Sequence, residues 1–147
     1  MKIVNQINRL FIKKFDHCWV PDFENSLLSG ELSDSNLEKI FIGPQTRFKK
    51  IVEERKNYKY KYLAIISGPE PQRSIFEDEI QNCFLKTNEH CAIINGLTNT
   101  KEISAEKITF YPHLETTAFR ELLTKSEFVI CRSGYSSIMD LYVLQKK

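Results

Sequence analysis

Residues 128–141 read FVICRSGYSSIMDL, and this stretch decides the fold. The continuous apolar run at 128–131 is typical of a strand buried on both faces of a parallel sheet. Three apolar residues further along recur at helical spacing, namely Ile138, Leu141 and Tyr142. The polar residues 132–137 lie between these two patterns. The stretch therefore predicts a strand that ends in Arg-Ser-Gly and leads directly into a helix.

The same alternation of strand and helix extends back to residue 62. Short apolar runs occupy YLAII (62–66), CAII (91–94) and ITFY (108–111), with a polar link at 95–107 that is expected to hold little regular helix. Helical stripes comprise Phe76, Ile80, Cys83 and Phe84, and then Phe119, Leu122 and Leu123. Strands that alternate with helices predict an α/β fold, a Rossmann-like parallel sheet with flanking helices. In the usual strand order 3-2-1-4, residues 128–131 form the fourth strand.

The first 61 residues follow a different pattern. An amphipathic helix is predicted from Val4, Ile7, Leu10 and Phe11. CWVPD (18–22) is typical of a strand that ends at Pro21, and 23–38 is expected to be a polar loop. Lys or Arg occupies seven of the fifteen positions from 47 to 61. Because Glu53 and Glu54 dilute this charge, a solvated helix or linker is favoured over a nucleic-acid surface.

Composition and charge narrow the class of protein. The chain has 147 residues, the length of one domain, and its 41% hydrophobic and 27% charged residues are ordinary for a globular protein. Its net charge of +2 requires neither a nucleic acid nor an acidic partner. The start MKIVNQINRLFIKKF lacks the apolar segment of a signal peptide, and no apolar stretch approaches the ~20 residues that span a bilayer. We therefore expect a cytoplasmic protein whose four cysteines are reduced.

Two His-Cys pairs, His17-Cys18 and His90-Cys91, raise the alternative of a zinc site. Each pair lies in or beside an apolar, strand-like run, and the sequence has no C-x-x-C spacing. Adjacent residues of a strand point to opposite faces, so one pair does not readily bind one metal ion. Buried free thiols are favoured, and neither a metal nor a cofactor is expected.

Two polar segments lie where an open parallel sheet binds ligands, beyond the carboxyl ends of its strands. SGPEPQR (67–73) follows the first strand, RSGYSS (132–137) follows the fourth, and each leads into a helix, whose N-terminus attracts anions. Gly134 would let the backbone approach a ligand, and Ser136 and Ser137 are candidates for capping the helix or binding a phosphate oxygen. Asp140 is a candidate acceptor for a ribose diol. Each residue alone is equally explained as a cap or a surface charge, whereas the two segments together favour a nucleotide site.

The stretch FVICRSGYSSIMDL closely resembles the carboxyl-domain signature of glycosyltransferase family 28. This is the group of the peptidoglycan GlcNAc transferase that makes lipid II, GT-B enzymes in which two Rossmann-like domains face each other across a cleft. In that signature a strand ends in Arg, then Ser or Ala and Gly, and an acidic residue follows eight positions after the Arg. The matching residues are Arg132, Ser133, Gly134 and Asp140, with Asp in place of the usual Glu. The resemblance implies that Asp140 holds the ribose hydroxyls of a UDP-sugar.

Other segments resemble the family in the same order, from about residue 40 to 145. Gly68 and Arg73 match the glycine-rich GGS-x-GAR loop that contributes to donor binding, although Pro69-Glu70-Pro71 replaces much of its small-residue run. GPQTR (43–47) resembles the interdomain G-N-P-V-R turn, which implies that Arg47 reaches into the cleft. The bend near His113 and Leu114 would offer backbone groups to the uracil.

The resemblance implies an inverting transferase that moves a hexosyl or GlcNAc unit from a UDP-sugar to a lipid-linked or cell-envelope acceptor. No residue is identified as the catalytic base. We expect 1–42 to be the tail of an amino-terminal domain plus an interdomain loop, 43–61 a basic linker, and 62–147 an incomplete carboxyl-terminal half of a GT-B fold that binds the donor. The alternatives are a non-catalytic UDP-sugar-binding module that needs a partner chain, and a UDP-sugar epimerase-like protein. Expected partners are a UDP-sugar, an acceptor-binding domain or chain and, peripherally, the inner face of a membrane, but no nucleic acid.

Overall fold

A computed structural model of the chain describes residues 15–25, 28, 30, 38–49, 57–97, 102–105 and 107–146. The chain divides into two compact units, Met1–Thr46 and Arg47–Lys147, and each is considered by itself. The helix predicted around residues 4–11 and the centre of the basic stretch, 50–56, lie outside the described residues.

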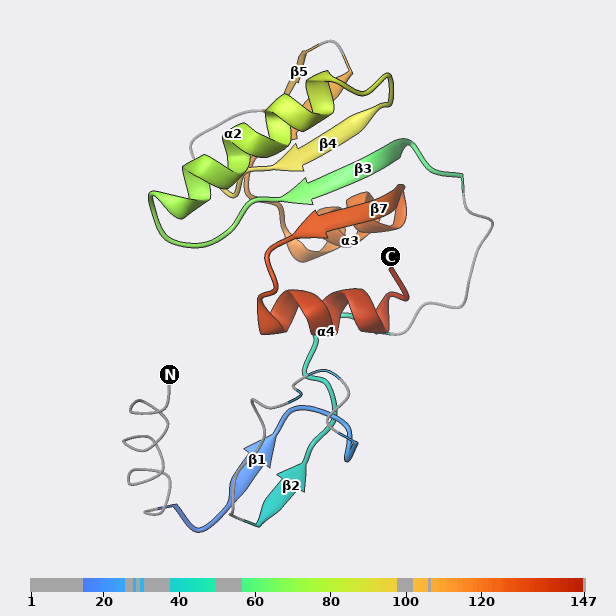
Figure 1. The fold of residues 1–147 in the computed structure, drawn as a ribbon. Helices are drawn as coiled ribbons and strands as arrows, with labels where there is room; N and C mark the ends of the chain where they lie inside the picture. Colours follow the sequence, from blue (N-terminus) through green and yellow to red (C-terminus); the bar gives the residue numbers. More distant parts are fainter. Residues whose placement is uncertain are drawn as a thin grey trace. The chain divides into compact units, whose positions relative to one another are not determined.

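The first unit contains two short parallel strands, β1 (Cys18–Val20) and β2 (Lys39–Phe41) (Figure 1). β1 confirms the strand predicted at CWV, whereas β2 was not predicted. Past the strands, Ile42 N donates to Val20 O at 3.0 Å. The buried Asp22 carboxylate follows Pro21 and accepts backbone N–H groups from Phe23 at 2.7 Å and Leu28 at 3.0 Å. This carboxylate therefore organises the turn after β1.

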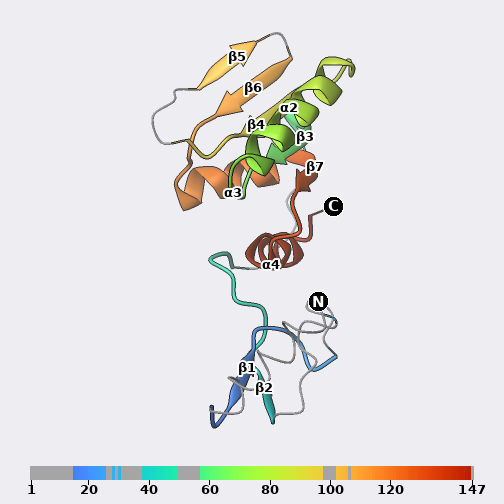
Figure 2. The same ribbon diagram turned by 60° about the vertical axis from the view of Figure 1, so that its left-hand side comes forward.

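The second unit is an α/β fold built on one mostly parallel sheet (Figures 1 and 2). Its strands are β3 (Tyr60–Ile65), β4 (Cys91–Ile94), β5 (Ile103–Ala105), β6 (Ile108–Tyr111) and β7 (Ser126–Cys131). The order is β5-β6-β4-β3-β7, and every neighbouring pair is parallel except β5 and β6. The described helices are α2 (Gln72–Leu85), α3 (Thr116–Thr124) and α4 (Tyr135–Val143).

This topology confirms the predicted order of the four apolar runs, since β6-β4-β3-β7 is the order 3-2-1-4. Two runs match observed strands residue for residue, and the other two begin two residues earlier than predicted. β5 was missed. It lies in the polar link 95–107, where Ile103–Ala105 pairs antiparallel with β6, and a three-residue edge strand leaves no apolar run in the sequence.

The two faces of the sheet carry separate apolar clusters. Ile80 and Phe84 of α2 pack on the face that contains Ala64 and Ile93. Leu122 and Leu123 of α3, together with Leu144, pack on the opposite face against Leu63 and Ile94. Figure 1 accordingly shows α2 on one side of the sheet and α3 on the other. Because successive strand residues face opposite sides, a strand covered on both faces must be continuously apolar, which is why the apolar runs located the sheet.

Two members of the predicted helical stripes are not buried. Cys83 is exposed, because the buried stripe of α2 contains Ile80 and Phe84 and leaves Cys83 at its margin. In α4 the buried residues are Met139 and Asp140, whereas Tyr142 is 44% exposed. The buried side of α4 is therefore displaced by about one position from the stripe predicted from hydrophobicity alone.

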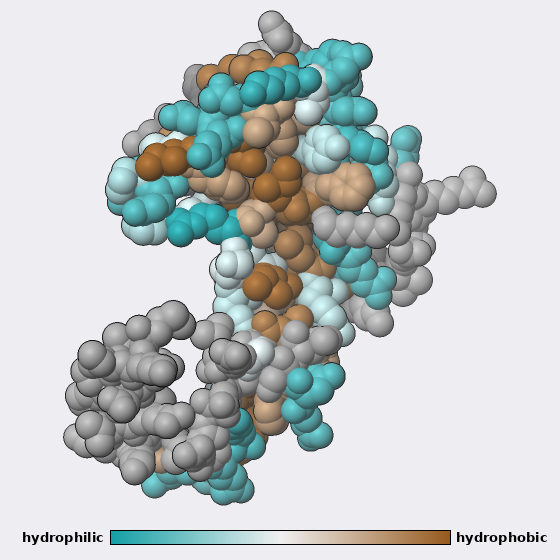
Figure 3. Space-filling view, viewed as in Figure 1, coloured by the Kyte–Doolittle hydropathy of each residue, from teal (hydrophilic) through white to brown (hydrophobic). Residues whose placement is uncertain are grey.

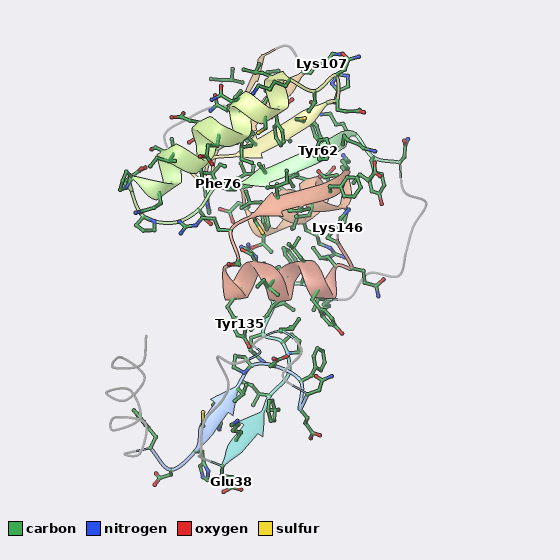
Figure 4. The ribbon with its side chains drawn as sticks, in the orientation of Figure 1. Glu38, Tyr62, Phe76, Lys107, Tyr135 and Lys146 are labelled. Atoms are coloured by element: carbon green, nitrogen blue, oxygen red, sulfur yellow. The ribbon has the colours of Figure 1, made fainter. Side chains whose placement is uncertain are left out.

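β7 lies at one edge of the sheet, with β3 as its neighbour among the described strands. Apolar side chains gather over β3 and β7 on the face shown in Figure 3. The rings of Tyr62 in β3 and Phe128 in β7 are stacked, with centroids 5.8 Å apart. Tyr62 also stacks on Phe84, which joins this surface to the core beneath α2 (Figure 4). Among the described helices, none combines the length and the apolar character needed to cross a membrane.

Candidate nucleotide-binding site

The carboxyl ends of the four parallel strands lie on the same side of the sheet. Figure 1 shows this for β3, β4 and β7. Hydrogen bonds extend the strand pairing into the loops that follow: Ile66 N donates to Ile94 O at 2.9 Å, and Asn95 N donates to Tyr111 O at 3.0 Å. His113 N donates to Leu97 O at 3.1 Å. The loops after β3, β4 and β6 are therefore fixed to one another by backbone contacts.

Arg132, the first residue after β7, lies directly over Gly68 in the loop after β3. Its Nη1 is 3.4 Å from Ser67 O, and a Cβ built on Gly68 would overlap this nitrogen. The φ of Gly68 is +111°, a conformation that side chains rarely allow. Among the residues that the structure describes, Arg132 has no ion-pair partner, and it is exposed. One unpaired cation is therefore held at the junction of the two predicted segments.

The helix that follows, α4, begins without a side-chain cap. Gly134 is the N-cap residue, with φ −69° and ψ 135°, and its N–H donates to Arg132 O at 2.7 Å. Within the described part of the chain, the N-cap residue Gly134 makes no side-chain cap hydrogen bond. The prediction that Ser136 or Ser137 caps the helix is wrong, because α4 already starts at Tyr135 (Figure 4) and places both serines within the first turn. Ser133 is exposed in the turn itself.

The N-terminus of α2 differs, because a carboxylate of the preceding loop lies there. Glu70 Oε2 accepts the Ser74 hydroxyl at 2.7 Å and the Ser74 N–H at 3.3 Å, and its Oε1 accepts Arg73 Nη1 at 3.1 Å. The hydrogen bond from the Ser74 side chain, followed by that from Arg73, holds the pKa of Glu70 below its usual value. The place where an anionic ligand would meet this helix is thus taken by the protein's own anion.

Arg73 is engaged on all sides by the protein. Its Nη2 donates to Asn95 O at 2.6 Å and lies 3.5 Å from the Glu77 carboxylate, in addition to the contact with Glu70. Only 15% of its side chain is exposed. Arg73 therefore connects the first turn of α2 to the loop after β4, which is a structural role.

Asp140 of α4 forms an ion pair with Arg47. The Nε of Arg47 lies 3.3 Å from Oδ2 of Asp140, whose side chain is 10% exposed. Arg47 is the first residue of the basic stretch 47–61, so this ion pair joins the start of that stretch to the second turn of α4. Two residues that the sequence placed at the site by separate arguments are in direct contact.

The remaining candidates, His113 and Leu114, follow β6. The His113 side chain is exposed, and the backbone N–H of His113 donates to Leu97 O. Leu114 is half-buried and packs against the apolar cluster on the α3 face. In the described part of the chain, no group of three His, Cys, Asp or Glu side chains is arranged to bind a metal ion. The four thiols are free, with Cys91 buried and Cys18 half-buried.

The sequence argument did not anticipate the roles of Glu70 and of the Arg47–Asp140 pair. Glu70 lies four residues before Ser74, a spacing that allows a side chain to cap an approaching helix, so a local signal was present. The pair with Asp140 joins positions that are distant in sequence, and no local signal exists for it.

Comparison of the chain with protein-family models, with curated proteins and with solved structures gave no match in any of the three. The fold and the arrangement of these residues are therefore the basis for a functional proposal.

Proposed function

We propose that this chain is the donor-binding part of an inverting glycosyltransferase and binds the diphosphate of a UDP-sugar at the start of α4. The observation that carries the proposal is the position of Arg132, an exposed guanidinium with no ion-pair partner among the described residues, over Gly68. It stands beside a helix N-terminus that lacks a side-chain cap. A cation next to the N-terminus of a helix attracts a diphosphate.

The choice between the two helix N-termini follows from their charges. At α2 the Glu70 carboxylate already accepts the hydrogen bonds that a phosphate would need, and Arg73 is neutralised by Glu70 and Glu77. A diphosphate placed there would be repelled by two carboxylates. We therefore assign the diphosphate to Arg132 and the first turn of α4, with Gly134 allowing close approach.

The chemical role of Arg132 and the first turn of α4 would be to stabilise the leaving group. In an inverting transfer an acceptor hydroxyl attacks the anomeric carbon while the nucleoside diphosphate departs with negative charge. A fixed guanidinium and a helix N-terminus favour that charge and lower the barrier. No described residue at this edge is assigned as the base, so we propose that the acceptor and the base come from the amino-terminal half of a GT-B fold.

The proposal is tested by calorimetric titration of the protein with UDP, ADP and GDP, using wild type, Arg132→Ala and Asp140→Ala. We expect selective binding of UDP. In Arg132→Ala we expect UDP affinity to fall about tenfold to a hundredfold, since a hydrogen bond to a charged group is worth about 1.5–3 kcal/mol. Arg120→Ala, on the exposed side of α3, removes the same charge and should leave affinity unchanged.

Two results would contradict the proposal. A folded wild-type protein that binds none of the three nucleotides has no donor site. Equal weakening by Arg132→Ala and Arg120→Ala would mean that UDP responds to net charge and not to the corner between β3 and α4.

A further inference from the structure

Arg47 lies on an aromatic surface formed by Phe48 and Phe119. Its Cζ is 5.3 Å from the centroid of the Phe48 ring and 4.7 Å from that of Phe119. The two rings are themselves stacked, with centroids 6.1 Å apart and an interplanar angle of 22°. Both cation–ring distances fall within the ~6 Å range of cation–π attraction. The guanidinium is therefore held in place, although 49% of the Arg47 side chain is exposed.

The same guanidinium holds the Asp140 carboxylate. The contact is made by Nε, 3.3 Å from Oδ2. The carboxylate plane of an aspartate has a broad rotational preference of its own, so a fixed cation beside one oxygen restricts its orientation. Phe119 of α3 thus holds Arg47, and Arg47 in turn restricts the orientation of the Asp140 carboxylate in α4.

We propose that Arg47 is a positioning residue for ribose recognition, which orients Asp140 to accept hydrogen bonds from both hydroxyls of the ribose. This inference rests on the proposed function, because it concerns the same UDP-sugar. A carboxylate has acceptor sites for several donors, so Asp140 can retain its contact with Arg47 while binding the diol. Whether both hydroxyls are bound depends on how the carboxylate is turned, and the contact with Arg47 contributes to that angle.

Selectivity for ribose over 2′-deoxyribose distinguishes this role from a merely structural one. The dissociation constants of UDP and 2′-deoxy-UDP are measured on wild type, Asp140→Asn, Arg47→Gln and Arg47→Lys, with Arg120→Gln as the charge-matched control. We expect wild type to prefer UDP at least tenfold, as the loss of one charge-assisted hydrogen bond predicts. The preference should fall below about threefold in Arg47→Gln and be intermediate in Arg47→Lys, which keeps the charge but not the planar stacking.

Phe119→Leu provides a second variant, which removes one ring of the aromatic surface while keeping Arg47. We expect it to reduce the preference for UDP partly, with a melting temperature close to that of Arg47→Gln. The inference is overturned if Asp140→Asn loses the preference and Arg47→Gln keeps it, and that result leaves the proposed function intact. If wild type binds no UDP, the proposed function fails and this inference fails with it.

Discussion

The N-termini of α2 and α4 both follow strands whose carboxyl ends lie on the same side of the sheet. The residues at these two N-termini differ in charge. At α2, Glu70 supplies an anion and Arg73 is held by two carboxylates and a carbonyl oxygen. At α4, Gly134 supplies no side chain, and Arg132 has no ion-pair partner among the described residues. In sequence the two segments look alike, as polar loops with an arginine before a helix. The comparison teaches that a carboxylate within such a loop determines whether the protein neutralises the nearby arginine, as it does at Arg73, or leaves it without an ion-pair partner among the described residues, as at Arg132.

The difference divides the two arginines by role. In our proposal, Arg73 contributes to the stability of the fold, and Arg132 contributes to binding the diphosphate. Gly68 contributes to both sites, since it lies in the loop that leads to α2 and also beneath the guanidinium of Arg132, the residue that precedes α4 by three positions. Substitutions at these positions test the division, beginning with the residue that should affect both properties.

Gly68→Ala is expected to have the largest effect. Its φ of +111° strains any residue with a side chain, at a cost of about 1–3 kcal/mol, and the new Cβ would also displace Arg132. We predict a melting temperature lower by several degrees together with a loss of UDP affinity as large as that of Arg132→Ala, measured by thermal unfolding and calorimetry.

The control is Gly134→Ala in the other corner, where φ is −69° and a Cβ would meet the Ser137 hydroxyl at an ordinary 3.7 Å. Its melting temperature should change little. If Gly68→Ala is as stable as Gly134→Ala, the close packing of Arg132 on the β3 loop is not a feature of the protein in solution.

Arg73→Gln should separate stability from binding. The substitution leaves Glu77 partly buried without its cation and removes the donor to Asn95 O, so we expect a destabilisation of about 1–3 kcal/mol in denaturant unfolding. The affinity of the folded protein for UDP should stay within about threefold of wild type. Arg132→Gln should show the reverse pattern, with stability unchanged and UDP affinity lowered about tenfold to a hundredfold. Similar losses of affinity in the two variants would mean that both corners bind the ligand.

Glu70→Gln should have the smallest effect, and it appears as a change in the pH dependence of stability. The pKa of Glu70 is held below its ordinary value of 4.5 in the folded protein, so its carboxylate stabilises the fold above that pH. This contribution is lost as the pH falls through the lower, folded pKa. Thermal unfolding from pH 7 to pH 3 should therefore show a weaker acid dependence in Glu70→Gln than in wild type.

The matched control for this measurement is Glu79→Gln, an exposed glutamate on the same helix. Its acid dependence should equal that of wild type. If the melting temperatures of Glu70→Gln and wild type fall equally from pH 7 to pH 3, the Ser74 and Arg73 contacts do not stabilise the ionised carboxylate.

The sequence by itself determined the sheet of the second unit. Strands covered by helices on both faces must be continuously apolar, so runs such as CAII and FVIC could be recognised and ordered without any tertiary information. It also located the edge where the polar loops gather, because parallel strands share their carboxyl ends. The three-residue strands β2 and β5 were not predicted, although β1, which has the same length, was.

Only the tertiary structure decided which of the charged side chains are paired with other groups of the protein. Glu70 and Glu77, three and four residues from Arg73, are local partners of that arginine. Its contact with Asn95 O and the position of Arg132 over Gly68 depend instead on segments that meet only in the folded protein. The same is true of Asp140, which is joined to Arg47 across most of the second unit's sequence. Periodicity depends on neighbours along the chain and can be read from the sequence, whereas the pairing of charges depends on which segments meet in space.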